Sequence, residues 1–119
     1  MNYNEFMKNN PSFGYLTIKA SSASEAIPVS GLKIEVSSDN IIFFNGETDK
    51  SGLIENIKLP APVNVSNNLD IPKRQEYLIK AIYEPDNFYL EYKVNIYENI
   101  TVIQNINVIP NVRIVKNGN

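Results

Sequence analysis

The residues that could do chemistry lie in a short turn-forming stretch, Thr48-Asp49-Lys50-Ser51-Gly52, preceded by Glu47. Two carboxylates this close could help to bind a calcium ion or act in acid–base chemistry. A calcium site, however, needs several converging oxygen ligands, and neighbouring strand residues point to opposite faces. An Asp in this position can accept hydrogen bonds from backbone N–H groups two and three residues on, and Gly can adopt positive φ. We therefore interpret Thr48, Asp49 and Gly52 as a structural turn.

Two residue types are missing from the 119 residues, His and Cys. Without Cys there is no disulfide, thiolate nucleophile or Cys-ligated zinc, and without His the commonest transition-metal ligand is absent. Ser-His-Asp and Cys-His catalysis are also excluded, which leaves paired carboxylates or a Ser-Lys dyad. The sequence predicts that the chain is not an enzyme, with no catalytic, cofactor-binding or metal-binding residue and no cofactor.

Three tyrosines are candidates for a ligand surface. Tyr83, Tyr89 and Tyr97 lie at alternating strand positions, from which aromatic rings could stack on sugar rings. The alternative is that they are simply compatible with packing on a strand.

Short segments rich in β-forming residues position these groups, and turn formers separate them. In the clearest, Phe88, Leu90, Tyr92, Val94 and Ile96 alternate with polar residues and tyrosines. The seven expected strands are Gly14–Ser21, Leu32–Ser37, Ile41–Glu47, Leu53–Leu59, Glu76–Glu84, Phe88–Tyr97 and Thr101–Ile109. The third, with four consecutive apolar residues, is expected to be covered on both faces. We expect Pro60–Lys73 to be a surface loop, because it contains three Pro and three Asn residues.

Seven short strands in one domain predict an all-β, seven-stranded Greek-key β-sandwich, because two sheets must bury each other's apolar faces. The expected organisation is an N-terminal arm at 1–13, the sandwich at 14–110 and a C-terminal tail at 111–119, with both arms poorly ordered.

The charge pattern bears on partners and location. The net charge of −2, with Lys73-Arg74 as the densest basic pair, predicts no nucleic-acid partner. No apolar run is long enough to span a membrane, and Met1–Phe13 lacks the features of a signal peptide. We expect a cytoplasmic protein or one deposited in the spore. The bias towards Asn and Ile is typical of AT-rich genomes and favours a low-GC bacterium of the Firmicutes.

The order strand, Thr48-Asp49-x-x-Gly52, strand, then Tyr77-x-Ile79, resembles the carboxypeptidase-regulatory-like and transthyretin-like (prealbumin-like) sandwiches. Asn87-Phe88-Tyr89 stands where Gly-Tyr is usual in that pattern, and Asn tolerates the same left-handed conformation. The resemblance implies a prealbumin-like or Ig-like sandwich. Some transthyretin-like proteins hydrolyse 5-hydroxyisourate with a His-dependent site, so we expect the fold without that activity.

A narrower similarity runs from Gly14 to about Pro110. It is to an accessory domain of clostridial spore proteins, where that domain precedes peptidoglycan-binding or cortex-lytic modules. The residues that carry it are Gly14, Tyr15, Pro28, Val29, Gly31, Thr48, Asp49, Gly52, Leu59, Pro60, Pro62, Gln104, Asn105 and Pro110.

The Cna B-type adhesin sandwich is another family to which the chain is similar. Those domains carry a Lys–Asn isopeptide bond promoted by a buried acid, and Lys19, Asn105 or Asn107, and Glu91 or Glu76 could supply the groups. Lys19 alternates with apolar residues, so we expect it to face solvent.

The function predicted from these observations is a non-catalytic binding or interaction module of a bacterial spore or cell envelope. Its partner would be a protein or a peptidoglycan-associated surface. One alternative is a structural or adhesin-type subunit that assembles through edge strands; another is a glycan-binding module.

Overall fold

The structure, a computed structural model, describes residues 2–22, 26–64 and 72–109. Within these ranges the chain forms one short α-helix, eight strands and a single 3-10 turn, η1. In chain order they are α1 (Tyr3–Asn9), β1 (Ser12–Ser22), β2 (Ile27–Pro28), β3 (Lys33–Ser38), β4 (Ile41–Glu47), β5 (Leu53–Ala61), β6 (Gln75–Tyr83), η1 (Glu84–Asp86), β7 (Phe88–Ile96) and β8 (Thr101–Asn107).

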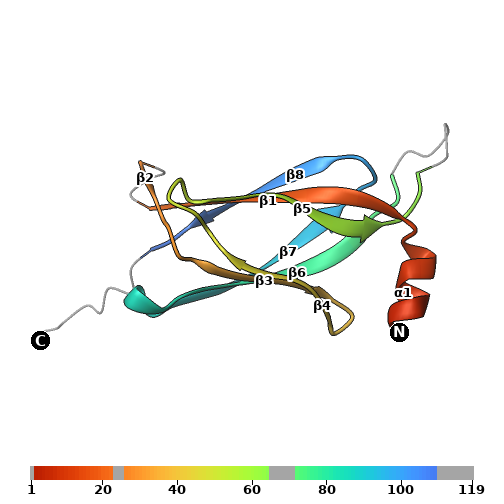
Figure 1. The fold of residues 1–119 in the computed structure, drawn as a ribbon, viewed down its shortest axis with the longest axis horizontal. Helices are drawn as coiled ribbons and strands as arrows, with labels where there is room; N and C mark the ends of the chain where they lie inside the picture. The colour runs from red at the N-terminus through yellow and green to blue at the C-terminus, as the bar shows by residue number, and fades with distance from the viewer. Residues whose placement is uncertain (1, 23–25, 65–71, 110–119) are drawn as a thin grey trace, which may run out of the picture.

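The strands form two sheets that face each other (Figure 1). In sheet A, β1 pairs antiparallel with β5 and β2 and parallel with β8. Sheet B is antiparallel throughout, in the order β4-β3-β6-β7. Figure 1 shows α1 at one end of the sandwich and β2 at the other. This arrangement confirms the predicted all-β sandwich, and the strand count differs only by the two-residue β2.

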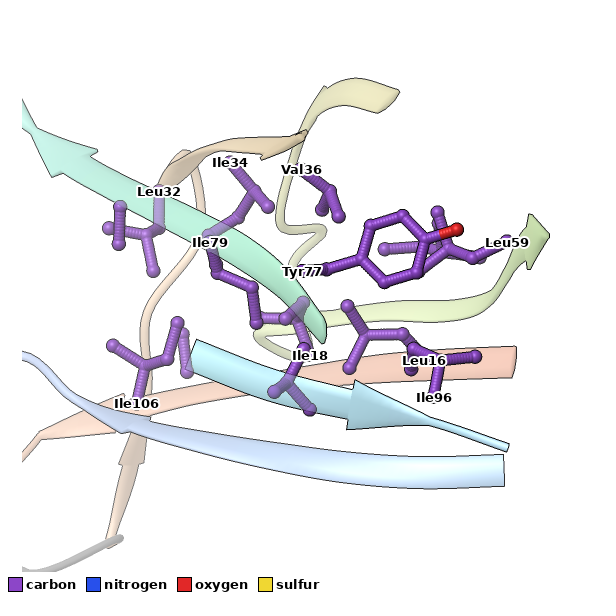
Figure 2. Close-up of a cluster of buried hydrophobic side chains, with 14 of the residues drawn as sticks. Leu16, Ile18, Leu32, Ile34, Val36, Leu59, Tyr77, Ile79, Ile96 and Ile106 are labelled. Atoms are coloured by element: carbon purple, nitrogen blue, oxygen red, sulfur yellow. The ribbon is translucent and has the colours of Figure 1, made fainter. Parts of the chain in front are cut away.

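The core lies between the sheets and is built by alternating residues of both. Figure 2 shows Leu16 and Ile18 of β1 below Ile79 and Tyr77 of β6, with their side chains filling the space between the layers. All four are at most 1% exposed. Alternate residues of a strand face opposite ways. The outer face of sheet B is therefore formed by every second residue of each strand, among them Lys33 and Glu35 of β3 and Lys80 of β6.

The sheets approach closely at Gly14, near the α1 end. A Cβ atom there would lie 2.1 Å from the carbonyl oxygen of Tyr97, so no larger residue fits without moving the backbone. The connection between β7 and β8 is held to β1 at the same end. The N–H of Asn99 donates to the Phe13 carbonyl, and the N–H of Tyr15 donates to the Ile100 carbonyl.

Two expectations about strands are wrong. Ile41–Glu47 is not covered on both faces: it is an edge strand, and Ile42 is 55% exposed. The pairing of β4 with β3 contains a bulge, because the register shifts between Val36 and Ser37. The apolar side chains of β4 therefore do not simply alternate between the two faces. The expected loop Pro60–Lys73 begins too early, because β5 continues through Pro60 to Ala61, and part of this expected loop, 65–71, lies outside the described residues. Proline is possible in β5 because β5 pairs only with β1 and an edge strand tolerates a missing N–H.

The N-terminal residues are not a poorly ordered arm. Asn2 caps α1 by accepting a hydrogen bond from the Glu5 N–H at 2.8 Å, and the Glu5 carboxylate accepts from the Asn2 N–H at 3.3 Å. Phe6 is completely buried and packs against Phe43, with ring centroids 4.9 Å apart, and against Tyr77. The helix therefore closes one end of the core, whereas the expected tail at 111–119 lies outside the described residues.

Candidate functional site

The turn between β4 and β5 is closed by Asp49. One carboxylate oxygen of Asp49 accepts hydrogen bonds from the backbone N–H groups of Ser51 at 2.8 Å and Leu53 at 3.0 Å. Gly52 has φ +77°, and a Cβ added there would lie 2.3 Å from the Ala20 carbonyl oxygen. The Asp49 carboxylate thus accepts hydrogen bonds from backbone N–H groups two and four residues further along the chain. The turn itself packs directly against β1.

Thr48 has a structural role that its sequence position does not reveal. Its hydroxyl, on a side chain buried to 4% exposure, donates to the Val29 carbonyl at 2.7 Å and accepts from the Leu32 N–H at 3.0 Å. The N–H of Thr48 donates to Leu32 and its carbonyl accepts from Gly31. Thr48 therefore fastens the β2–β3 connection to the β4–β5 turn.

The three candidate tyrosines do not share one face. Tyr83 is partly buried and packs against the core, with the same parity as Tyr77. Tyr89 is 52% exposed on the outer face of sheet B, where its hydroxyl donates to Glu91 and this hydrogen bond raises the Tyr89 pKa. Tyr97 follows the end of β7 and is partly buried. A flat platform made of all three rings is therefore not present.

The acids considered for an isopeptide bond lie apart from the Lys–Asn pair. Lys19 is exposed on the outer side of sheet A, next to Asn105 in the parallel register of β1 and β8. Asn107 lies opposite Ser21. Glu76 and Glu91 are exposed residues of sheet B, the other layer of the sandwich, so neither is a buried acid beside Lys19.

Three hollows follow one another along β6, on the outer face of sheet B and around its α1 end. Their volumes are about 580, 440 and 370 Å³. The first two share Gln75 and Glu76, and the third is bordered by Lys80 and Ile82. The seven residue steps from Gln75 to Ile82 correspond to roughly 23 Å at the usual rise of a strand.

The hollow at the α1 end is polar and carries cations. Asn9 and Asn95 supply side-chain amides beside the buried Asn10, and Lys73 and Arg74 supply exposed cations. Across Gln75 and Glu76, the second hollow adds the Lys93 ammonium, the Asp39 carboxylate and the hydroxyls of Ser37 and Ser38. The two hollows together hold three cations and two carboxylates, in a chain whose net charge is −2.

A chain of hydrogen bonds fixes the wall between these two hollows. The side-chain amide of Asn10, only 1% exposed, donates to the Phe6 carbonyl at 2.9 Å and to the side-chain oxygen of Gln75 at 3.2 Å. The Gln75 amide donates to the Ser38 hydroxyl at 3.0 Å, and this hydroxyl donates to the Glu76 carbonyl at 2.7 Å. Gln75 is therefore held in one orientation before any ligand arrives.

The residues that enter β6 are fixed in a similar way. The Asn64 side chain exchanges two hydrogen bonds with the backbone of Lys73, at 2.7 and 3.1 Å. Glu98 accepts from the Asn64 N–H at 2.8 Å and from the Ser12 hydroxyl at 2.7 Å. These bonds, that of Asn64 foremost, lower the pKa of Glu98. The position of the Lys73-Arg74 pair is thus tied to β1 and to the β7–β8 connection.

The third hollow is more apolar and is bordered by paired charges. Ile82 is 37% exposed, and the Lys80 ammonium lies 3.9 Å from the Glu35 carboxylate. Nearby, Lys33 forms an ion pair with Glu84 at 3.3 Å. Along β6 the face therefore changes from side-chain amides and exposed cations to paired charges around Ile82.

The residues that build this face were not identified from the sequence. Lys73 and Arg74 were noted there only as too small a basic cluster for nucleic acid, and Asn10, Gln75 and Asn95 carried no recognisable spacing. In the described part of the chain, no three acidic side chains gather in a way that could hold a metal ion. Within the same residues, no helix is long and apolar enough to cross a membrane.

Comparison with known proteins finds relatives only at the level of structure. No family model matches the sequence, and no curated protein matches it. A 5-hydroxyisourate hydrolase from Klebsiella pneumoniae superposes with a TM-score of 0.56 at 16% identity, covering 80% of this chain and 90% of the hydrolase. The TIE protein of Bacillus anthracis gives 0.62 at 21% identity, covering 82% of this chain and 16% of that one. GBS52, the minor pilin of Streptococcus agalactiae, gives 0.53 at 18% identity, covering 88% of this chain and 48% of the pilin.

These similarities correct the prediction that the chain is not an enzyme. A hydrolase has the same sandwich over most of its length, so the fold gives no ground for excluding catalysis. Identities of 16–21% establish the architecture alone. The chain has a transthyretin-like β-sandwich fold, one that a hydrolase, a pilin and part of the TIE protein share.

Proposed function

We propose that this domain is a binding module that holds a polymeric ligand along β6, on the outer face of sheet B. The observation that carries the proposal is the succession of three hollows along one strand, two of them joined at Gln75 and Glu76. A row of hollows of this kind suits an extended chain with repeating groups better than a single small molecule.

The chemistry of the α1 end favours a glycan that carries carboxylates. The side-chain amide of Asn95 can donate to and accept from sugar hydroxyl and N-acetyl groups, while Asn10 and Gln75, whose amide hydrogens are already paired, form the wall beside it. Lys73 and Arg74 can form charge-assisted hydrogen bonds with carboxylates. Because Gln75 is already held by Asn10 and Ser38, little side-chain freedom is lost on binding.

Peptidoglycan combines these features, since it is a glycan polymer with N-acetyl groups and carboxylate-bearing peptides. We therefore propose peptidoglycan, in a bacterial spore or cell envelope, as the ligand surface. The sequence resembles accessory domains of clostridial spore proteins, although no family model and no curated protein matches it, and this resemblance is the reason for proposing a spore setting. A minor pilin of a Gram-positive bacterium shows that a domain with this fold can occur in a surface protein.

Cosedimentation with purified peptidoglycan sacculi tests the proposal. We expect the wild-type protein to sediment with sacculi, and Arg74→Ala to weaken the apparent affinity about tenfold, the effect of losing one charge-assisted hydrogen bond. Asn95→Ala should act in the same direction. Lys19→Ala is the matched control, since it removes one exposed cation from sheet A.

Two results would contradict the proposal. One is a folded wild-type protein that stays in the supernatant with sacculi from both spore cortex and vegetative wall. The other is binding that Arg74→Ala, Asn95→Ala and Lys19→Ala reduce equally. Stronger binding to cortex than to vegetative wall is the outcome that supports the spore setting in particular.

A further inference from the structure

The edge strands of the two sheets differ in how they are protected against pairing with another chain. Natural sheets blunt their edges with bulges, prolines, charged residues or covering elements. Among the described residues, β2, β4, β5, β7 and β8 each pair with a single neighbouring strand. The two-residue β2 contains Pro28, so four of these five edges carry such a device.

The protection on β4, β5 and β7 takes different forms. The pairing of β4 with β3 contains a bulge, and α1 packs on β4 through Phe6 and Phe43. In β5 a bulge in the pairing with β1 accompanies Asn56 at φ +58°, and Pro60 follows. On β7, Glu91 and Lys93 place charges on the outer face.

β8 carries none of these devices. Its sequence, Thr-Val-Ile-Gln-Asn-Ile-Asn, contains no charge and no Pro, and it pairs with β1 in register without a bulge. Three isoleucines in or beside β8 are also exposed: Ile100 is 51% exposed, Ile103 61% and Ile109 62%, whereas Ile106 and Val108 are buried in the core. An uncharged, regular and partly apolar edge is the kind that accepts another strand.

The hydrogen bonds between β8 and β1 show which backbone groups of β8 point away from β1. The Ile100 carbonyl accepts from β1 and the Val108 N–H donates to it, so even-numbered residues of this segment direct their backbone groups towards β1. The backbone groups of Thr101, Ile103, Asn105 and Asn107 therefore point to the open edge, because bonding direction alternates along a strand. The Gln104 side-chain amide already donates to the Asn105 carbonyl at 2.9 Å, so in a pair of strands this carbonyl would accept a second hydrogen bond through its other lone pair.

We propose that β8 pairs antiparallel with β8 of a second copy of this chain, about a twofold axis at Gln104. This register pairs all of Thr101–Asn107 and matches the open-edge groups of Ile103 with those of Asn105 in the partner. It places Val102 opposite Ile106 on the inner side, where Ile106 is already buried in the core of its own copy. On the outer side, the two Ile103 side chains become diagonal neighbours, within reach of each other.

Self-complementarity is the reason for choosing a second copy as the occupant. A strand with no charge meets no like-charge repulsion when it pairs with itself, and a twofold axis uses the same patch on both subunits. No alternation of charges marks β8 for a charged partner strand. This proposal is independent of the ligand proposed for sheet B.

Charge substitution at Gln104 tests the register. Because Gln104 faces its own copy, Gln104→Lys and Gln104→Glu each place like charges opposite one another. We expect analytical ultracentrifugation to detect a monomer–dimer equilibrium in the wild type and each single variant to dimerise at least tenfold more weakly. An equimolar mixture of the two variants should recover the dimer, because Lys then faces Glu. Asn45→Lys, on the exposed edge of β4, is the control and should dimerise like the wild type.

Hydrogen exchange on the full chain gives a second measurement. The amides of Thr101, Ile103, Asn105 and Asn107 should become more protected as protein concentration rises. A wild type that remains monomeric at high concentration would overturn the proposal. So would protection of these amides that does not depend on concentration, since a segment of the same chain would then cover the edge. A mixture of the Lys and Glu variants that associates no better than either alone would refute the register centred on Gln104.

Discussion

Thr48→Val isolates the contribution of one buried hydroxyl to the fold. Valine has nearly the same shape as threonine, so packing is preserved while the hydroxyl is lost. The Leu32 N–H then loses its acceptor at 3.0 Å and the Val29 carbonyl loses its donor at 2.7 Å. At a site that is 4% exposed, water cannot readily replace the lost partner.

The cost can be worked from these two groups. A buried backbone group left without a partner costs about 1–3 kcal/mol, so for two groups we expect Thr48→Val to lower the free energy of unfolding by about 2–6 kcal/mol. For a domain of this size each kcal/mol corresponds to roughly 3–5 °C, which gives a fall in Tm on the order of 10 °C. Urea unfolding followed by tyrosine fluorescence, together with calorimetry, measures both quantities.

Thr48→Ser is the matched control, because it keeps the hydroxyl and removes one methyl group. Its cost should stay near 1 kcal/mol, the value of a buried methylene. If Thr48→Val is no more costly than Thr48→Ser, the hydroxyl does not hold the two connections together and our reasoning about this turn is wrong.

Four further substitutions test the turn and the groups that hold the entry to β6. Gly31→Ala should lower the free energy of unfolding by about 1 kcal/mol, because Gly31 has φ +81° and open space around it. Gly52→Ala should lower it by about 3 kcal/mol or more, because the added Cβ also clashes with the Ala20 carbonyl. Equal losses in urea unfolding would contradict this difference. Asp49→Ala should lower the free energy of unfolding by about 0.5–2 kcal/mol. Calcium should leave the melting temperature of the wild type and of Asp49→Ala unchanged. Glu98 has a lowered pKa, so its contribution is complete above its ordinary pKa of 4.5 and is lost as the pH falls through the folded-state value. Glu98→Gln should therefore flatten the decline of Tm with pH in acid; an unchanged pH profile would show that the hydrogen bonds of Glu98 do not contribute.

Period-2 alternation made much of the fold predictable. It located β1, β3, β6 and β7 within two residues at each end, because these strands have one face on the core and one on solvent. The bounds of β4 were also predicted, and only its expected burial on both faces was wrong, because a bulge and an edge position produce an apolar run without full burial. Period-2 alternation missed α1, whose seven residues are too few to show a helical period, although the Asn2–Glu5 capping box was readable.

The candidate site was largely unpredictable because it is assembled from the ends of elements. Asn10 follows α1, Lys73 and Arg74 precede β6, and Asn95 lies in β7, so their proximity depends on the pairing of β6 with β7 and on the docking of α1. No sequence spacing encodes that arrangement. The tyrosines illustrate the opposite case, in which a visible pattern suggested a surface but strand parity places Tyr83 on the inner face and Tyr89 on the outer one.

The two proposed surfaces lie on different sheets, and this has a consequence for binding. Pairing through β8 extends sheet A and leaves the outer face of sheet B uncovered in both copies. A polymer could then contact both copies at once, and the second contact would be intramolecular, which can raise the overall affinity by about 10²–10⁴. Gln104→Lys leaves the hollows along β6 unchanged. It should therefore weaken cosedimentation with sacculi while leaving the affinity for a soluble peptidoglycan fragment the same. If Gln104→Lys weakens binding to sacculi and to the soluble fragment equally, Gln104 belongs to the ligand site itself. If Gln104→Lys binds each ligand as tightly as the wild type does, the dimer contributes nothing to attachment.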